Sequence, residues 1–290
     1  MIAVGVLLRR AFQLDMKTLS KLNFYLFSPS IMFKMLYESE LSLAILFQVL
    51  LFFAVFFISL FLLVELVVFL RGYKGGMKSA MRNSVLFYNS ANYAIPLNQL
   101  VFVGDPFTLS IQIIIMMMQN LIPNTYGIYS VNAHKQTWRQ TLHTILTFPA
   151  IYVIPIAFLM RGLDIPVPHP IYVSIDYVSG GFIATALVTL GAQLGGMKWR
   201  FRLTDVLLSN ALRLCAGPAL GFAVVSLLGI EGTMAQALVL SCAVPTSLSS
   251  MLLAVEFDNE PEFASQAVLS STVFSIFTVT LVIYLIQFIQ

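Results

Sequence analysis

Two stretches of the chain carry polar side chains and a proline inside runs that are otherwise apolar. The first covers residues 88–99, YNSANYAIPLNQ, and the second covers residues 240–250, LSCAVPTSLSS. A proline inside a helix removes one backbone hydrogen bond and displaces the carbonyl group one turn earlier. In lipid the freed groups must be satisfied by the protein or by enclosed water, and nearby amides and hydroxyls can do this.

Full breaks near Ile95-Pro96 and Val244-Pro245 would leave two half-helices that begin in the middle of the membrane. A helix N-terminus carries about half a positive charge, which favours the binding of an anion. We therefore expect a carboxylate between the two half-helices. The alternative is that each proline makes a simple kink, but two polar breaks at matching places in the chain favour a site. The residues predicted to bind substrate are Asn89, Asn92, Pro96, Pro245, Thr246 and Ser247.

Three further charged residues lie inside apolar segments, where an ionisable side chain is a functional candidate by default. Glu65 lies shortly before Arg71, so we expect a structural role at the cytoplasmic rim. Asp176 and Arg213 lie on consecutive segments and are open to two roles. They could pair with each other, or they could act on the substrate or a proton, and an unpaired Arg213 would attract an anion. In the glycine-rich end of the same region, Gln193 is a candidate to line a cavity.

The composition places these stretches in a membrane. Of the 290 residues, 59% are hydrophobic and 10% are charged, against about 45–50% and about 25% in a soluble domain. Repeated apolar runs are long enough to cross a bilayer, which predicts an all-α membrane protein with ten transmembrane helices. The predicted segments are about 1–9, 19–37, 41–70, 77–103, 107–132, 142–160, 171–196, 203–228, 234–255 and 263–289.

Basic residues set the expected orientation. Thirteen of the 16 Lys and Arg residues fall in alternate connections, and positive residues stay cytoplasmic. Both termini should therefore face outward from a multi-pass protein of the cell (inner) membrane. The basic residues form no patch, so no nucleic-acid partner is expected. The acidic connection at residues 256–262 fits the alternation less well, although acids carry little weight in this rule.

Ten segments divide into two sets of five, and an odd number requires that the two halves be inverted relative to each other. Pro96 and Pro245 lie 149 residues apart, close to half the chain. The predicted units are a first repeat at 1–132, a cytoplasmic connection at 133–141 and a second repeat at 142–290. The fourth and ninth helices would be the crossed, broken ones. The first segment is too short to span the membrane, so we expect its start to be missing.

These residues resemble the auxin efflux carrier family of membrane transporters, in its bacterial form. The run at 89–96 is similar to the family's N-T-G-N-x-G-[LI]-P segment, and AVPT at 243–246 with AVE at 254–256 is similar to its second crossover. LGAQL at 190–194 fits its L-G-x-x-L stretch, and GVLLRR at 5–10 matches the end of its first helix. The likeness covers nearly the whole chain. Ala91 and Ala94 stand where the family has glycine.

The resemblance implies a ten-helix carrier that divides into a scaffold and a moving transport domain. It places Asn89, Pro96, Pro245 and Thr246 at the crossover that holds the substrate. Bacterial relatives of this kind are associated with small carboxylates, and the resemblance also allows a homodimer through the scaffold. No cofactor or metal site is expected.

The leading hypothesis is a secondary transporter of a small organic anion, of the efflux carrier type, working by alternating access in the lipid bilayer. The chain carries no HExxH, G-x-S-x-G or P-loop motif, so we do not expect an enzyme. One alternative is a sodium-coupled symporter similar to bile-acid carriers. Uptake that does not depend on sodium would exclude this alternative. Another is a transporter-like sensor, which ligand binding without flux would favour.

Overall fold

The computed structural model describes residues 1–12, 14–38, 42–127, 130–131, 146, 149–196 and 203–289. Within these residues every regular element is a helix. Four helices are long and apolar enough to cross a membrane, which confirms the all-α membrane class. They are Ala44–Arg71, His169–Gly196, Thr204–Leu228 and Pro261–Ile286.

The described helices overlap the predicted ranges, two of which are interrupted, at 87–93 and at 243–247. In chain order they are α1 (Ile2–Phe12), α2 (Met16–Leu22), η1 (Asn23–Phe27), α3 (Ser28–Glu38), α4 (Leu43–Arg71), α5 (Gly75–Leu86), α6 (Ala94–Val101), α7 (Pro106–Ile122), η2 (Pro123–Gly127), α10 (Ala150–Gly162), α11 (His169–Gly196), α12 (Leu203–Ala211), η3 (Leu212–Ala216), α13 (Gly217–Leu228), α14 (Gly232–Cys242), α15 (Leu248–Glu256) and α16 (Pro261–Ile286). The segments labelled η are single π-helical turns: η1 and η3 lie between consecutive α-helices, and η2 directly follows α7.

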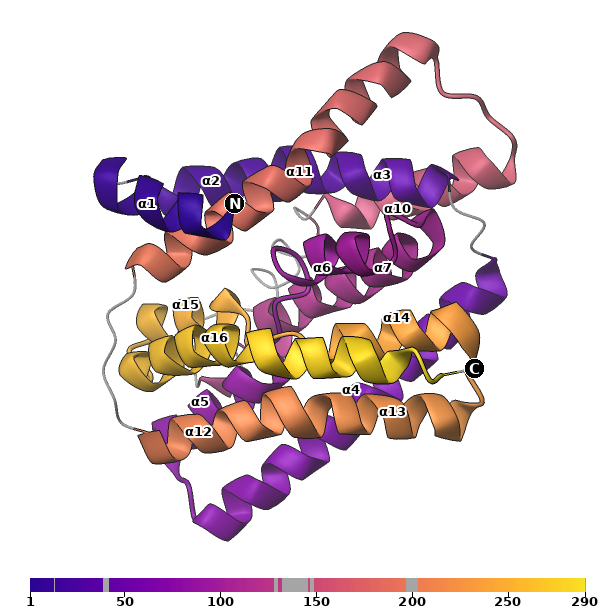
Figure 1. The fold of residues 1–290 in the computed structure, drawn as a ribbon. Helices are drawn as coiled ribbons and strands as arrows, with labels where there is room; N and C mark the ends of the chain where they lie inside the picture. Colours follow the sequence, from indigo (N-terminus) through magenta and orange to yellow (C-terminus); the bar gives the residue numbers. More distant parts are fainter. Residues whose placement is uncertain are drawn as a thin grey trace.

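A first layer is formed by α1, α2, α3 and α11, with α10 beside α3 (Figure 1). Helix α1 lies along the C-terminal half of α11 and requires glycine at the contact. A Cβ atom on Gly191 would lie 2.0 Å from the carbonyl oxygen of Ile2, and one on Gly5 would lie 2.2 Å from that of Val188. Small residues allow such close helix approach in membranes, so the glycine-rich end of α11 is a packing surface.

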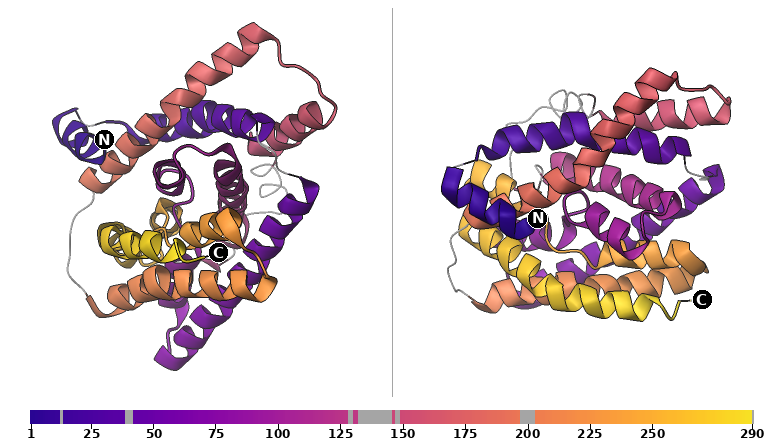
Figure 2. Two further views of the ribbon diagram at one scale, coloured as in Figure 1. Left: turned by 45° about the vertical axis from the view of Figure 1, so that its right-hand side comes forward. Right: turned by 45° about the horizontal axis from the view of Figure 1, so that its top comes forward.

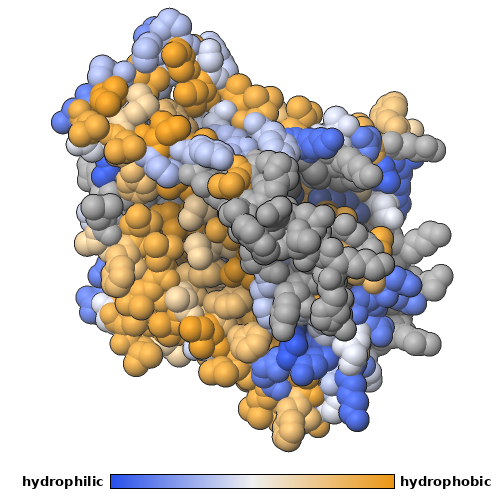
Figure 3. Space-filling model, turned by 180° about the vertical axis from the view of Figure 1, so that it is seen from behind, coloured by the Kyte–Doolittle hydropathy of each residue, from blue (hydrophilic) through white to orange (hydrophobic). Residues whose placement is uncertain are grey.

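A second layer contains α4, α5 and the helices from α12 to α16, and α6 and α7 lie between the two layers (Figures 1 and 2). Its core includes the fully buried ring of Phe56 on α4, which packs edge-on to Tyr88 at a centroid distance of 6.4 Å. Hydrophobic side chains cover a broad flank of the outer surface (Figure 3). An apolar flank of this kind suits contact with lipid.

Several connections meet at one end of the molecule. Arg71, at the end of α4, lies 3.2 Å from Asp205 at the start of α12. Asn259 donates hydrogen bonds to the Gly76 carbonyl (3.3 Å) and the Ser79 hydroxyl (3.0 Å) at the start of α5. The acidic connection at 256–262 therefore lies at the same end as the basic connection between α4 and α5. Five of the basic residues that set the expected orientation lie outside the described residues: Lys135, Arg139, Lys198, Arg200 and Arg202.

Both polar stretches interrupt their helices, but the first break is not where the sequence predicted it. The chain is non-helical at 87–93, so the prediction of an unwound point at Ile95-Pro96 was wrong. Pro96 lies in the first turn of α6, where backbone N–H groups have no helical partner and a proline costs no hydrogen bond. The second break, at 243–247, does include Pro245. The two breaks therefore correspond at a larger spacing than the two prolines.

Candidate functional site

The two helix breaks meet in a short antiparallel backbone bridge, which we call the crossing. The Asn89 N–H donates to the Pro245 carbonyl (2.8 Å), and the Ser247 N–H donates to the Phe87 carbonyl (2.7 Å). Backbone groups freed by a break in an apolar interior are costly unless they are paired. Here each break supplies part of the hydrogen bonding that the other needs.

Buried side chains satisfy further backbone groups around this bridge. The Thr246 hydroxyl, whose residue is completely buried, donates to the Ser84 carbonyl at 2.7 Å. Gln119 on α7 accepts from the Tyr88 N–H (3.3 Å) and donates to the Leu86 carbonyl (3.2 Å). Thr246, which was predicted to bind substrate, and Gln119, which was not predicted, therefore both stabilise the crossing.

Arg213 lies against the same crossing and is completely buried. Its guanidinium donates to the Val85 carbonyl at 3.1 Å and to the Cys242 carbonyl, and it lies 4.6 Å from the centre of the Tyr88 ring. The alternative of an Asp176–Arg213 pair is wrong, because Asp176 on α11 forms an ion pair with Lys34 on α3 instead. Asp176 is thus paired within the first layer, and Arg213 bonds to backbone carbonyls of the second layer.

Glu65 has the structural role that the sequence suggested. Its carboxylate forms an ion pair with Arg82, through two hydrogen bonds between α4 and α5. The two side chains lie on consecutive helices and both are partly shielded from solvent. The pair fastens α5 to α4 and takes no part in the crossing.

A cavity of about 100 Å³, with amide and hydroxyl side chains among its lining residues, lies beside the crossing. It is enclosed by the first break, by α7, by the start of α15 and by Gln193 of α11, so residues from both layers contribute to it. None of its lining residues carries a charge at neutral pH. The lining residues are Tyr88, Asn89, Ser90, Ala91, Asn92, Gln119, Asn120, Gln193, Ser247, Leu248, Ser249 and Leu252.

Both half-helices begin at this cavity, although local groups already accept their first N–H bonds. The Ala94 N–H donates to the Asn89 carbonyl at 3.1 Å, and the Ser249 N–H donates to the capping hydroxyl of Ser247 at 3.2 Å. The positive ends of the two helix dipoles still lie near the cavity. The direct donors available to a ligand are therefore the side-chain amides and hydroxyls of the lining.

Three of the predicted site residues line the cavity, namely Asn89, Asn92 and Ser247, and so does Gln193. Thr246, Pro245 and Pro96 are not among the lining residues: Thr246 and Pro245 bond within the crossing, and Pro96 belongs to α6. Sequence reasoning missed Gln119 and Asn120 on α7. The signal for them was a pair of adjacent amides inside the apolar run IQIIIMMMQNLI at 111–122.

Comparison with known families decides the class of protein. Residues 133–283, just over half of the chain, match the model of the family described as "Membrane transport protein", the family of the auxin efflux carriers. The chain belongs to this family. The matched region includes α11, Arg213 and the second broken helix, and it begins after the first broken helix.

A relative points the same way. An "Uncharacterized transporter" of Methanothermobacter thermautotrophicus is 24% identical over 136 residues, which are 46% of this chain and 44% of the relative. The match therefore spans less than half of that protein's length. The family match and the four apolar helices together show a multi-pass membrane protein of the membrane transport family.

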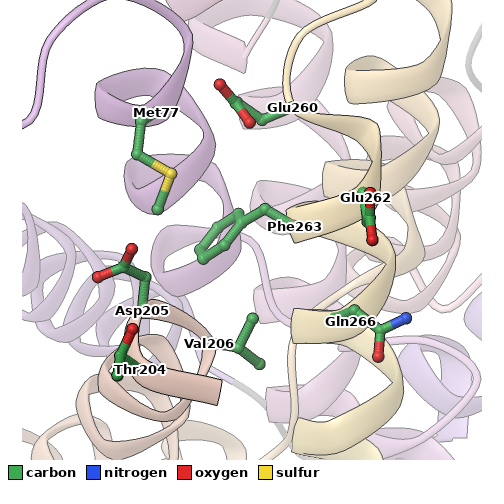
Figure 4. A pocket seen from close by; sticks show the side chains of 8 residues that line it. All are labelled: Met77, Thr204, Asp205, Val206, Glu260, Glu262, Phe263 and Gln266. Atoms are coloured by element: carbon green, nitrogen blue, oxygen red, sulfur yellow. The ribbon is translucent and has the colours of Figure 1, made fainter. Parts of the chain in front are cut away.

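A second cavity, of about 320 Å³, lies at the end of the molecule where the acidic connection meets α5 and α12. Phe263 extends into its centre, with Met77 and Val206 around it (Figure 4). Asp205 lines this cavity and also accepts hydrogen bonds from Arg71 and Tyr73. Partial burial and the bond to Asp205 raise the pKa of the Tyr73 hydroxyl. None of the predicted site residues lines it.

Proposed function

We propose that this chain is a secondary transporter of a small organic anion, a carboxylate, that works by alternating access in the cell membrane. The observation that carries this proposal is the amide- and hydroxyl-bearing cavity at the crossing, which residues of both layers line. A ligand held there would contact groups on each side of any movement between the layers. A site of that kind suits a carrier that opens alternately to the two sides.

The lining of the cavity favours an anion. Its amides and hydroxyls can donate hydrogen bonds, and it contains no carboxylate that would repel a negative charge. Two half-helices begin beside it, and the buried guanidinium of Arg213 lies against the ring of Tyr88, a lining residue. The volume of about 100 Å³ is below the roughly 300–1,000 Å³ of pockets for drug-sized ligands. A substrate with few heavy atoms fits that size.

The proposed architecture is ten transmembrane helices in two inverted repeats, at 1–132 and 142–290, joined by the connection at 133–141. The layer of α1, α2, α3, α10 and α11 would be the scaffold, with a homodimer contact on it, and the rest would move. Described basic residues lie at helix ends, with Arg9 in the last turn of α1 and others in the connection between α4 and α5. We propose that this end is cytoplasmic and that both termini face outward.

The test is uptake of radiolabelled small carboxylates into proteoliposomes by the wild type and an Asn89→Ala variant. Asn89 lines the cavity, and its bond to the Pro245 carbonyl uses the backbone N–H, which alanine retains. Loss of a hydrogen bond to a charged group costs about 1.5–3 kcal/mol, so we expect transport to fall by about tenfold to a hundredfold. The matched control is Gln48→Ala, which removes an exposed amide on α4.

Equal uptake of every carboxylate by the wild type and Asn89→Ala would overturn the assignment of the site. A carboxylate that binds the purified wild type but never crosses the vesicle membrane would favour the ligand sensor instead. Uptake that requires sodium would favour the sodium-coupled symporter. The family membership makes transport the first expectation.

A further inference from the structure

Arg213 is a buried cation that the cavity does not use directly. It is completely buried, it is not among the cavity's lining residues, and no carboxylate within the described residues forms an ion pair with it. A charged side chain deep in a membrane protein is costly unless something compensates it. The compensation must therefore come from the groups that it touches.

Those groups are the C-terminal ends of two half-helices. The Nη1 nitrogen donates to the carbonyl of Val85, in the last turn of α5, and the Nη2 nitrogen donates to that of Cys242, the last residue of α14. The last four carbonyls of a helix lack helical partners, and a helix C-terminus carries about half a negative charge. Two such ends together offer about one negative charge to one guanidinium.

The surroundings of the guanidinium are shaped for a cation. The face of the Tyr88 ring lies 4.6 Å away, and aromatic faces attract cations. Gly217 follows Arg213 by one helical turn, and a Cβ atom there would lie 2.8 Å from Nη2. Arg213 itself belongs to η3, a π-helical turn within the α12–α13 helix, and such turns frequently occur at functional sites.

Carbonyl groups at the ends of broken helices are the ligands that many secondary transporters use for a coupling cation. We infer that Arg213 is a built-in cation that occupies this position permanently, so that the crossing is complete without a mobile ion. Removal of the guanidinium would leave two helix ends and an aromatic face around an empty space. That space would accept a free monovalent cation, guanidinium best, because it reproduces both hydrogen bonds.

The inference goes beyond the proposed function and needs no transport substrate for its test. The melting temperatures of the purified wild type and Arg213→Ala are measured with increasing guanidinium, sodium, potassium or choline chloride, at low millimolar concentration and constant ionic strength. A ligand that binds only the folded protein stabilises it in a saturable way. We expect the variant to gain about 2–4 °C with guanidinium and the wild type to be unaffected by every salt.

Two controls separate this effect from general ones. Arg71→Ala removes an arginine from an exposed ion pair, and it should show no response specific to guanidinium. Arg213→Lys keeps a positive charge at the crossing, so it should fold without an added cation and show no sodium response. If Arg213→Ala can be purified only in the presence of guanidinium, that result supports the inference as well.

Three results would overturn it. The first is a wild type whose melting temperature rises specifically with sodium, because its cation position would then be vacant. The second is an Arg213→Ala variant that is as stable as the wild type and indifferent to all four salts. The third concerns the case in which Arg213→Ala does not fold in any salt. A melting temperature of Arg213→Lys that rises specifically with sodium then rejects the inference. Absence of carboxylate transport alone would count against the proposed function and not against the inference about Arg213.

Discussion

Gly217 makes a close approach possible that a single methyl group would prevent. Its missing side chain leaves room for the Arg213 guanidinium, and a Cβ atom would also lie 3.1 Å from the Cys242 carbonyl. Overpacking costs about 1–3 kcal/mol, offset by up to about 1 kcal/mol of helix propensity. We expect Gly217→Ala to lower the melting temperature. Gly180→Ala is the control, because a Cβ atom there meets nothing within 4 Å.

A double-mutant cycle shows which neighbour resists the methyl group. With Arg213→Ala in place the guanidinium is gone, so Gly217→Ala should cost much less than it does alone, a departure from additivity expected of residues in contact. If the cost is the same in both backgrounds, the Cys242 carbonyl is the obstacle and the account of Gly217 is wrong.

Single residues were predictable where composition alone carried the signal. Asn89, Asn92 and Ser247 stand out as polar residues in apolar runs, and all three line the cavity. The partners of Arg213 were not predictable, because they are two backbone carbonyls and every residue type carries such a group. Thr246 has a polar side chain that could bind a ligand, but its hydroxyl donates to the Ser84 carbonyl. The polar residue types show which part of the chain forms the site. Only the structure shows which of these residues line the cavity and which stabilise the backbone around it.

At the scale of elements, the two broken helices depend on the backbone bridge between them. Ser247 has φ −75°, which suits proline, and its N–H donates to the Phe87 carbonyl at 2.7 Å. Ser247→Pro therefore removes the bridge hydrogen bond without opposing the backbone conformation. A buried acceptor left without its donor costs about 1–3 kcal/mol. We expect Ser247→Pro to melt at a lower temperature than Ser247→Ala, which also loses the capping hydroxyl but keeps the N–H.

Equal melting temperatures for the two Ser247 variants would contradict a stabilising role for the bridge. The break positions also show what sequence can predict at this scale. Proline marked the second break correctly, but in the first it lies in the turn that follows the break. A proline is compatible with a helix start and with a loop, so the choice depends on which backbone groups find partners across the crossing. Those partners lie far away along the chain.

At the scale of the whole molecule, composition was sufficient for the all-α membrane class, and the layered packing needed the structure. Apolar periodicity does not show which helices pack together, because helices that face lipid and helices that face each other are equally apolar. The layering matters for function because α11 belongs to the first layer and α15 to the second, and both line the cavity. If the layers move relative to each other, residues across this cavity must change their separation.

A reversible cross-link between the layers tests that movement. Gln193→Cys on α11 and Ser249→Cys on α15 are combined in a background where the natural Cys215 and Cys242 are replaced by serine and alanine. A short bifunctional thiol reagent should stop carboxylate flux in proteoliposomes, and reduction should restore it, because rigid-body movement of one bundle against another underlies alternating access. Asn210 and Ser270, joined at 2.8 Å within the second layer, provide the control pair. Their cross-link should leave flux unchanged, since both would move together. Full flux in fully cross-linked Gln193–Ser249 protein would mean that transport requires no movement between α11 and α15.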